Sequence, residues 1–82
     1  MRADEARKII LLCIEIITGF DYLWEEIDGK SFTEIGMSSL ESVMTLVEIE
    51  NRVDYEFEDS LYSINEIEKI LTEKGWKYEG IK

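Results

Sequence analysis

The chain has no histidine and a single cysteine, Cys13, and these two shortages exclude much of the chemistry that small proteins perform. Histidine is the commonest general base and the commonest side-chain ligand of transition metals. One cysteine can form neither an internal disulfide bond nor a zinc site. A serine nucleophile needs an adjacent base, and Ser38 and Ser39 have neither a histidine nor a suitably placed lysine near them. We therefore expect a protein that is not an enzyme and that holds no metal ion.

A long apolar run is also missing. The longest apolar stretch, residues 9–17, contains Glu15 and is too short to span a bilayer. The first residues, MRADEARK, are charged and lead directly into an amphipathic pattern, which is unlike a signal peptide. A lone cysteine suits a reducing compartment. Together these features predict a soluble, cytoplasmic protein.

Length and composition indicate one small domain, residues 1–82. The chain has 82 residues and no linker-like stretch, and 45% of its residues are hydrophobic. That proportion supplies enough apolar material for a single core, although so short a chain buries a modest fraction of its surface. We expect a marginally stable, folded domain.

The charge is strongly acidic and unevenly distributed, with 19 acidic and nine basic residues and a net charge of −10. Residues 21–59 contain only two bases, Lys30 and Arg52, but twelve acids: Asp21, Glu25, Glu26, Asp28, Glu34, Glu41, Glu48, Glu50, Asp54, Glu56, Glu58 and Asp59. Such a field repels nucleic acid and anionic membranes and attracts basic protein surfaces. The plainer alternative is a solvated surface that only keeps the protein soluble.

Hydrophobic spacing predicts a first amphipathic helix over residues 3–18, followed by a stop at Gly19. Its inward residues are Ala6, Ile9, Ile10, Cys13, Ile14 and Ile17. Residues 19–37 read as a long loop. A loop of that length is uncommon in a small domain unless it is packed down or functional. The apolar residues that would pack it down are Phe20, Leu23, Trp24, Ile27, Phe32 and Ile35.

Two capping boxes mark the remaining helices. Ser38-x-x-Glu41 opens a second helix that should run from Ser38 or Ser39 to about Val53. Ser63-x-x-Glu66 opens a last helix through about Glu73, with Gly75 as its stop. The acidic connection between them, residues 54–62, is expected to contain a short third helix. The fold class is therefore all-α: a small bundle of three main helices plus a short one, with a long loop between the first two.

The second helix is more apolar than one buried face requires. On a helical wheel its apolar residues cover roughly 220°, whereas a typical surface helix has an apolar stripe nearer 100°. We assign Leu46, Ile49 and Val53 to the core. Leu40, Met44 and Val47 are then left facing outward, as an apolar patch with an acidic rim that suits docking. The alternative is that the long loop folds over this patch and covers it.

A motif at the start of this helix resembles the attachment motif of acyl carrier proteins and peptidyl carrier domains, which reads F-x-x-L-G-x-D-S-L. The matching residues are Phe32-x-x-Ile35-Gly36-Met37-Ser38-Ser39-Leu40. The similarity continues through the amphipathic first helix, the long loop, the pattern Leu40-x-x-Val43-x-x-Leu46-Val47-x-x-Glu50 and the closing helix. In that family the serine before the leucine receives a 4′-phosphopantetheine arm from coenzyme A. The arm holds acyl or aminoacyl groups as thioesters.

The resemblance implies a non-catalytic carrier for fatty-acid, polyketide or related biosynthesis, with Ser39 as the attachment site. A phosphopantetheinyl transferase and acyl-processing enzymes would be its partners, meeting a monomer through basic and apolar docking surfaces. The implied docking residues are Leu40, Glu41, Met44, Val47 and Glu48. Neither nucleic acid nor membrane is an expected partner.

Two positions depart from the family pattern. Ser38 replaces the usual aspartate, so the helix can still be capped but a negative charge associated with transferase recognition is lost. Met44 stands where fatty-acid carriers often have an acid, which points toward a specialised-metabolite or peptidyl carrier. A different class of protein also fits the composition: a small acidic helical adaptor or inhibitor that binds a basic protein and uses the serine pair only as a helix cap.

Overall fold

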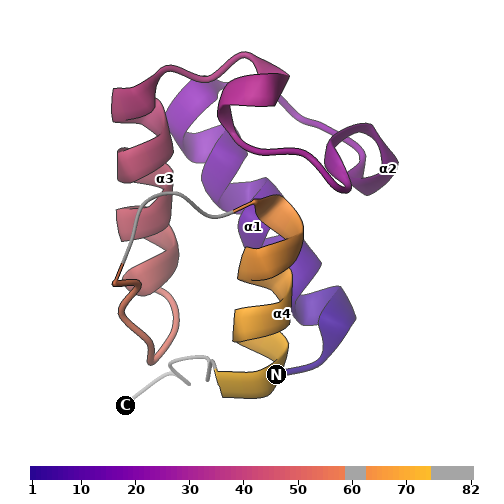
Figure 1. Cartoon of the computed structure of the whole chain (residues 1–82), viewed down its shortest axis with the longest axis vertical. Coiled ribbons are helices and arrows are strands. Elements are labelled where there is room, and N and C mark those ends of the chain that lie inside the picture. The colour runs from indigo at the N-terminus through magenta and orange to yellow at the C-terminus, as the bar shows by residue number, and fades with distance from the viewer. Residues whose placement is uncertain (59–62, 75–82) are drawn as a thin grey trace.

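The computed structural model describes residues 1–58 and 63–74. These residues form α1 (Ala3–Thr18), a short α2 (Trp24–Ile27), a 3₁₀ turn η1 (Thr33–Ile35), α3 (Ser39–Glu50) and α4 (Ile64–Lys74) (Figure 1). No strand occurs within the described ranges, where an isolated antiparallel bridge pairs Ser31 with Ser63. The predicted all-α bundle is confirmed. No helix in this part of the chain combines the length and apolarity that crossing a membrane requires.

Helix α1 has the predicted boundaries and the predicted stop. Gly19 adopts a left-handed conformation (φ 81°) and its amide donates to the carbonyl oxygen of Glu15 at 2.7 Å. A residue with a side chain would be strained there, and glycine is not. Of the six residues assigned inward, five are buried and Ile17 is half-buried.

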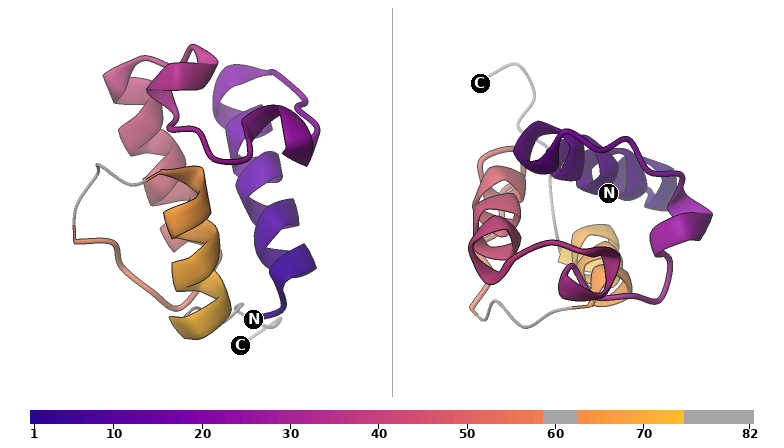
Figure 2. Two further views of the ribbon diagram at one scale, coloured as in Figure 1. Left: turned by 45° about the vertical axis from the view of Figure 1, so that its right-hand side comes forward. Right: turned by 90° about the horizontal axis from the view of Figure 1, so that it is seen from above.

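Helix α1 is the centre of the bundle. It packs against both α3 and α4 and runs antiparallel to each (Figures 1 and 2). Arg7 of α1 pairs with Glu68 of α4 at 2.5 Å, and its guanidinium lies 5.1 Å above the ring of Trp24 in α2. The buried core draws on every helix, and its members are Ala6, Ile9, Ile10, Cys13, Ile14, Ile27, Phe32, Met37, Leu46, Ile49, Val53, Ile64, Ile67 and Leu71.

The segment between α1 and α3 is not the continuous loop predicted, because it contains α2 and η1. Helix α2 is preceded by Leu23, whose amide donates to Oε1 of Glu26 at 2.8 Å, and it buries Ile27. The apolar residues of this segment were expected to pack it down. Ile27 and Phe32 do so, but Phe20 and Leu23 are 62% and 61% exposed.

Helix α3 ends at Glu50, three residues before the predicted end, because the Arg52 amide bonds three residues back to the Ile49 carbonyl (2.9 Å). Val53 is nevertheless fully buried, just after the helix. The short helix expected within residues 54–62 is not present over 54–58, and residues 59–62 lie outside the described ranges.

The predicted capping box opens α4. The Ser63 amide donates to Oε1 of Glu66 at 2.7 Å, and the Glu66 amide donates to Oγ of Ser63 at 3.2 Å. The start of this helix is also fixed to the segment before α3, since the Ile64 amide donates to the Lys30 carbonyl at 2.8 Å. Helix α4 continues to Lys74, one residue beyond the prediction, and the expected stop at Gly75 lies outside the described residues.

Candidate functional site

A tight turn just before α3 fixes the position of the start of that helix. The Gly36 amide donates to the Thr33 carbonyl at 3.1 Å and the Met37 amide to the Phe32 carbonyl at 3.1 Å. These paired bonds are those of a Schellman motif, which needs a left-handed residue at the position of Gly36 (φ 98°). Phe32 and Met37, the two ends of the motif, are both buried in the core. The turn is therefore fixed by packing as well as by hydrogen bonds.

A second link holds this turn from outside. The hydroxyl of Tyr22 donates to the carbonyl oxygen of Ile35 at 3.0 Å, across 13 residues of sequence. Tyr22 and Ile35 are half-buried and pack against the core. The segment before α3 is thus tied down on both sides, and the first residue of α3 has a defined position.

The helix itself starts with the predicted capping box. The Glu41 amide donates to Oγ of Ser38 at 3.1 Å, and the Ser38 amide donates to Oε1 of Glu41 at 2.9 Å. Each side chain satisfies a backbone donor of the first turn that has no partner inside the helix. Ser38 is therefore fully used as a cap, as the sequence predicted.

Ser39 is different from its neighbour. It is the first residue of α3 and is exposed, and its hydroxyl makes no hydrogen bond to any described residue. The amides of Ser39 and Leu40 also lack acceptors within the described ranges, as expected for the first turn of a helix. An anion attached to this hydroxyl would meet two free N–H groups and the positive end of the helix dipole.

The inward face of α3 is unusual because two of its buried residues are small and polar. The hydroxyl of Ser42 donates to the Ser38 carbonyl at 2.9 Å, and that of Thr45, fully buried, donates to the Glu41 carbonyl at 2.8 Å. Each hydroxyl is satisfied within the helix, so burial leaves no donor unpaired. Leu46 and Ile49 complete this face, as predicted.

The outward face carries the larger apolar side chains. Leu40, Val43, Met44 and Val47 are 68%, 43%, 44% and 47% exposed, so the loop before α3 does not cover them. The helix thus exposes four large apolar side chains, while two of the four residues that it buries are polar. Since burying one such side chain is worth about 1.5–3 kcal/mol, this face is a strong candidate for an interface.

Two acidic residues, seven positions apart, lie on one side of α3. Glu41 and Glu48 are both half-buried, and Glu48 pairs with Arg52 at 3.0 Å. Burial raises the pKa of the Cys13 thiol to about 12, while the nearby Arg52 lowers it and Glu48 raises it further. Cys13 is therefore held as a neutral thiol, which agrees with its predicted role as a small core residue.

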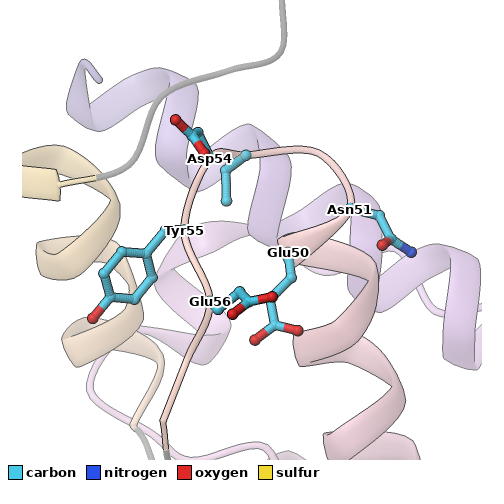
Figure 3. A pocket seen from close by; sticks show the side chains of 6 residues that line it. Glu50, Asn51, Asp54, Tyr55 and Glu56 are labelled. Carbon is cyan, nitrogen blue, oxygen red and sulfur yellow. The ribbon is translucent and has the colours of Figure 1, made fainter.

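The opposite end of α3 borders an open hollow (Figure 3). It is lined by Glu50, Asn51, Val53, Asp54, Tyr55 and Glu56. The Glu50 carboxylate is engaged, because it accepts the Phe57 amide at 2.6 Å. Within residues 1–58 and 63–74, no group of three or more His, Cys, Asp or Glu side chains is arranged to hold a metal ion. The hollow is also at the end of the helix remote from Ser39.

The structure gathers all the predicted site residues on one helix, but sequence reasoning missed a neighbouring feature. Leu12 and Ile16 of α1 are 43% and 48% exposed. Their spacing of four residues was a signal that they share a face. The sequence prediction for the first helix considered only the side chains that it buries.

No family model, curated protein or solved structure matches the chain. Its function is therefore inferred from its own residues and their arrangement.

Proposed function

We propose that this protein is an acyl or peptidyl carrier that bears a 4′-phosphopantetheine arm on Ser39 and presents thioester-bound intermediates to biosynthetic enzymes. The observation that carries the proposal is the contrast between two adjacent serines. Ser38 is occupied as a helix cap, whereas Ser39 is exposed and its hydroxyl has no partner among the described residues. The pair sits in the motif that resembles the carrier family.

The residues fit a phosphodiester at this point. The free amides of Ser39 and Leu40 and the helix dipole favour negative charge there. The Glu41 carboxylate, the nearest acid in sequence, is held by the Ser38 amide at 2.9 Å. A carrier also needs its modified residue to be rigidly placed yet open to large enzymes. The Schellman turn at Gly36 and the Tyr22 bond to Ile35 supply the rigidity, and the exposure of Ser39 supplies the access.

The attachment reaction would require only an accessible serine hydroxyl from this chain. The Ser39 oxygen would form a bond to the phosphorus that bears pantetheine in coenzyme A, and the bond from that phosphorus to adenosine bisphosphate would break. The serine proton would pass to a base of the transferase, since the carrier itself has no histidine. This division of labour agrees with the shortage of catalytic residues: the transferase supplies the base and the carrier supplies a placed hydroxyl.

The exposed face beside Ser39 would serve as the docking surface. Leu40, Met44 and Val47 are exposed, and Glu41 and Glu48 flank them. Carriers must bind and release several enzymes in turn, which favours a small apolar contact guided by charge. The acid surplus of residues 21–59 would guide partners that have basic surfaces. The predicted location is the cytoplasm, where such pathways and coenzyme A meet.

Intact mass spectrometry tests the attachment site. After incubation with coenzyme A and a broad-specificity phosphopantetheinyl transferase, the protein should gain the mass of one phosphopantetheine. Ser39→Ala should gain nothing, while the matched control Ser38→Ala should still be modified. Absence of any gain with several transferases, or a gain that survives Ser39→Ala, would contradict the proposal.

The same exposed face also supports a second candidate, an acidic adaptor that binds a basic protein and carries no prosthetic group. Either function would use the apolar side chains that α3 exposes. The mass experiment separates them, because the adaptor predicts no modification of Ser39 while the face remains available for binding.

A further inference from the structure

Two helices, rather than α3 alone, expose apolar side chains. Leu12 and Ile16 lie one turn apart on α1 and are nearly half exposed. They could face α3, face α4 or point away from both. Which of these holds decides whether the apolar residues of α1 and α3 form one surface or two.

Contacts to either side of α1 fix its rotation. Arg7 marks the flank toward α4, since it pairs with Glu68. Helix α1 also packs against α3, so the other edge of its buried arc, at Ile9 and Cys13, marks the flank toward α3. At about 100° per residue, Arg7 lies about 120° from Cys13 in one direction, and Ile16 and Leu12 lie about 60° and 100° from it in the other. Leu12 and Ile16 therefore border α3.

The matching residues of α3 lie on its flank toward α1, against which it packs. The charge of Glu48 acts on the Cys13 thiol, which agrees with a place on this flank, and Met44 is one turn before Glu48 on the same side of the helix. Because the two helices are antiparallel, the end of α1 and the start of α3 lie at the same end of the bundle (Figure 1). Ile16, near the end of α1, and Met44, in the first half of α3, therefore both lie toward this shared end. We call the exposed residues Leu12, Ile16, Leu40, Met44 and Val47 the two-helix face.

The charges around this face indicate what kind of partner would bind it. Glu41 and Glu48 lie on the side of α3 that borders Met44, and Arg52 is paired with Glu48 at 3.0 Å. A second copy of the chain would bring two molecules of net charge −10 together, which is unfavourable. A surface with an apolar centre and lysines or arginines around it complements both the apolar and the acidic parts.

We propose that the two-helix face is a docking site for a protein surface with an apolar centre and a basic rim, and that Ile16 and Leu12 of α1 contribute to binding together with α3. The proposal deepens the proposed function and rests on it for the kind of partner. It adds α1 to the contact, so selectivity among partners would depend on the first helix as well as on the helix that carries Ser39.

An amphipathic peptide helix of leucine and lysine is a suitable probe. Titrated into the ¹⁵N-labelled full chain, it should shift amide signals of both α1 around Leu12 and Ile16 and α3 around Met44. A peptide with the same leucines and with glutamate in place of lysine should not bind. Ile16→Ser should weaken binding of the lysine peptide about tenfold, whereas Leu23→Ser, at an exposed apolar position outside the face, should not.

Several results would overturn the inference: no binding, shifts confined to α3, equal binding of the glutamate peptide, or an unchanged affinity of Ile16→Ser. Self-association of the chain without peptide, broken by Ile16→Ser, would show a second copy as the occupant instead. None of these readouts needs modified Ser39. If Ser39 is not modified but the lysine peptide binds as expected, the carrier function is wrong and the docking face stands. If Ser39 is modified but the peptide does not bind as expected, the carrier function stands and the docking face is wrong.

Discussion

Ser38 and Glu41 satisfy each other's backbone amides across the first turn of α3, with hydrogen bonds of 3.1 Å to the serine hydroxyl and 2.9 Å to the glutamate carboxylate. This reciprocal pair engages the hydroxyl of Ser38 and leaves Ser39, one residue later, outside the network. The two adjacent serines therefore differ: Ser38 caps the helix, whereas Ser39 is exposed and its hydroxyl has no partner among the described residues.

Removing the cap should weaken the fold without preventing modification. Ser38→Ala leaves the Glu41 amide without its acceptor, and we expect a loss of about 1 kcal/mol in the free energy of unfolding. Ser39→Ala removes an exposed hydroxyl with no partner among the described residues and should change stability by less than about 0.5 kcal/mol. Urea denaturation followed by circular dichroism measures both. Equal effects of the two substitutions would contradict the division of roles.

If the proposed function holds, an aspartate at position 38, as in the attachment motif of carrier proteins, should help the transferase. Ser38→Asp keeps an oxygen that can cap the helix and adds a carboxylate beside the attachment serine. If recognition uses that charge, kcat/KM for modification of Ser39 should rise several-fold. The control is Ser38→Asn, which caps equally well and has almost the same shape without the charge. Equal rates for the Asp and Asn variants would show that the charge has no part in recognition.

The outward direction of Met44 can be checked by stability. Because its side chain is 44% exposed, Met44→Glu should leave the fold intact and change the free energy of unfolding by less than about 0.5 kcal/mol. Leu46→Ala, two residues away and 4% exposed, should cost about 2–5 kcal/mol. Engagement with cognate enzymes should weaken in Met44→Glu. An unfolded Met44→Glu variant would place Met44 in the core and contradict the exposed face.

The buried thiol predicts a loss of stability in alkali. Burial raises the pKa of Cys13 from its ordinary 9.0 to about 12 in the folded protein. The folded state therefore keeps a proton that the unfolded state releases, so the contribution is complete below pH 9 and is lost as the pH rises toward 12. Between pH 9 and 12, ionisation of this thiol should lower the free energy of unfolding by up to about 1.4 kcal/mol per pH unit.

The control for this effect is Cys13→Ala, which lacks the titrating group while other groups still titrate. The difference in unfolding free energy between the wild type and this variant should shrink from pH 9 to 12. The native thiol should also react with iodoacetamide only on unfolding. A difference that is independent of pH, or rapid labelling of the folded protein, would show that Cys13 is accessible.

The parts of this fold that could be predicted from sequence are those encoded locally. Gly19 ends α1 through its own left-handed conformation, and the boxes at Ser38 and Ser63 each use partners three residues apart. The inward positions of Leu46 and Ile49 and the outward positions of Leu40, Met44 and Val47 also followed from the sequence, because the apolar arc of α3 is too wide for one buried face, whereas burial of Ser42 and Thr45 was not predicted. Such features depend on the nearest turn of chain and leave a readable pattern.

What could not be predicted depends on distant contacts or lacks a local signal. The N-cap position of α2 is Leu23, which is not a capping residue type, and Glu26 supports the first turn by accepting the Leu23 amide. The start of α4 is tied to the Lys30 carbonyl, 34 residues before Ile64. The flank on which Leu12 and Ile16 lie is set by how α1 packs, so the second half of the docking face became visible only in three dimensions.

Locating the modification within the wild-type chain tests the central claim most directly. After treatment with transferase and coenzyme A, fragmentation mass spectrometry of the peptide that contains both serines can assign the added group to one residue. We predict that every fragment carrying phosphopantetheine includes Ser39, and that fragments ending at Ser38 are unmodified. A modified Ser38, or an unmodified peptide after treatment with several transferases, would contradict it.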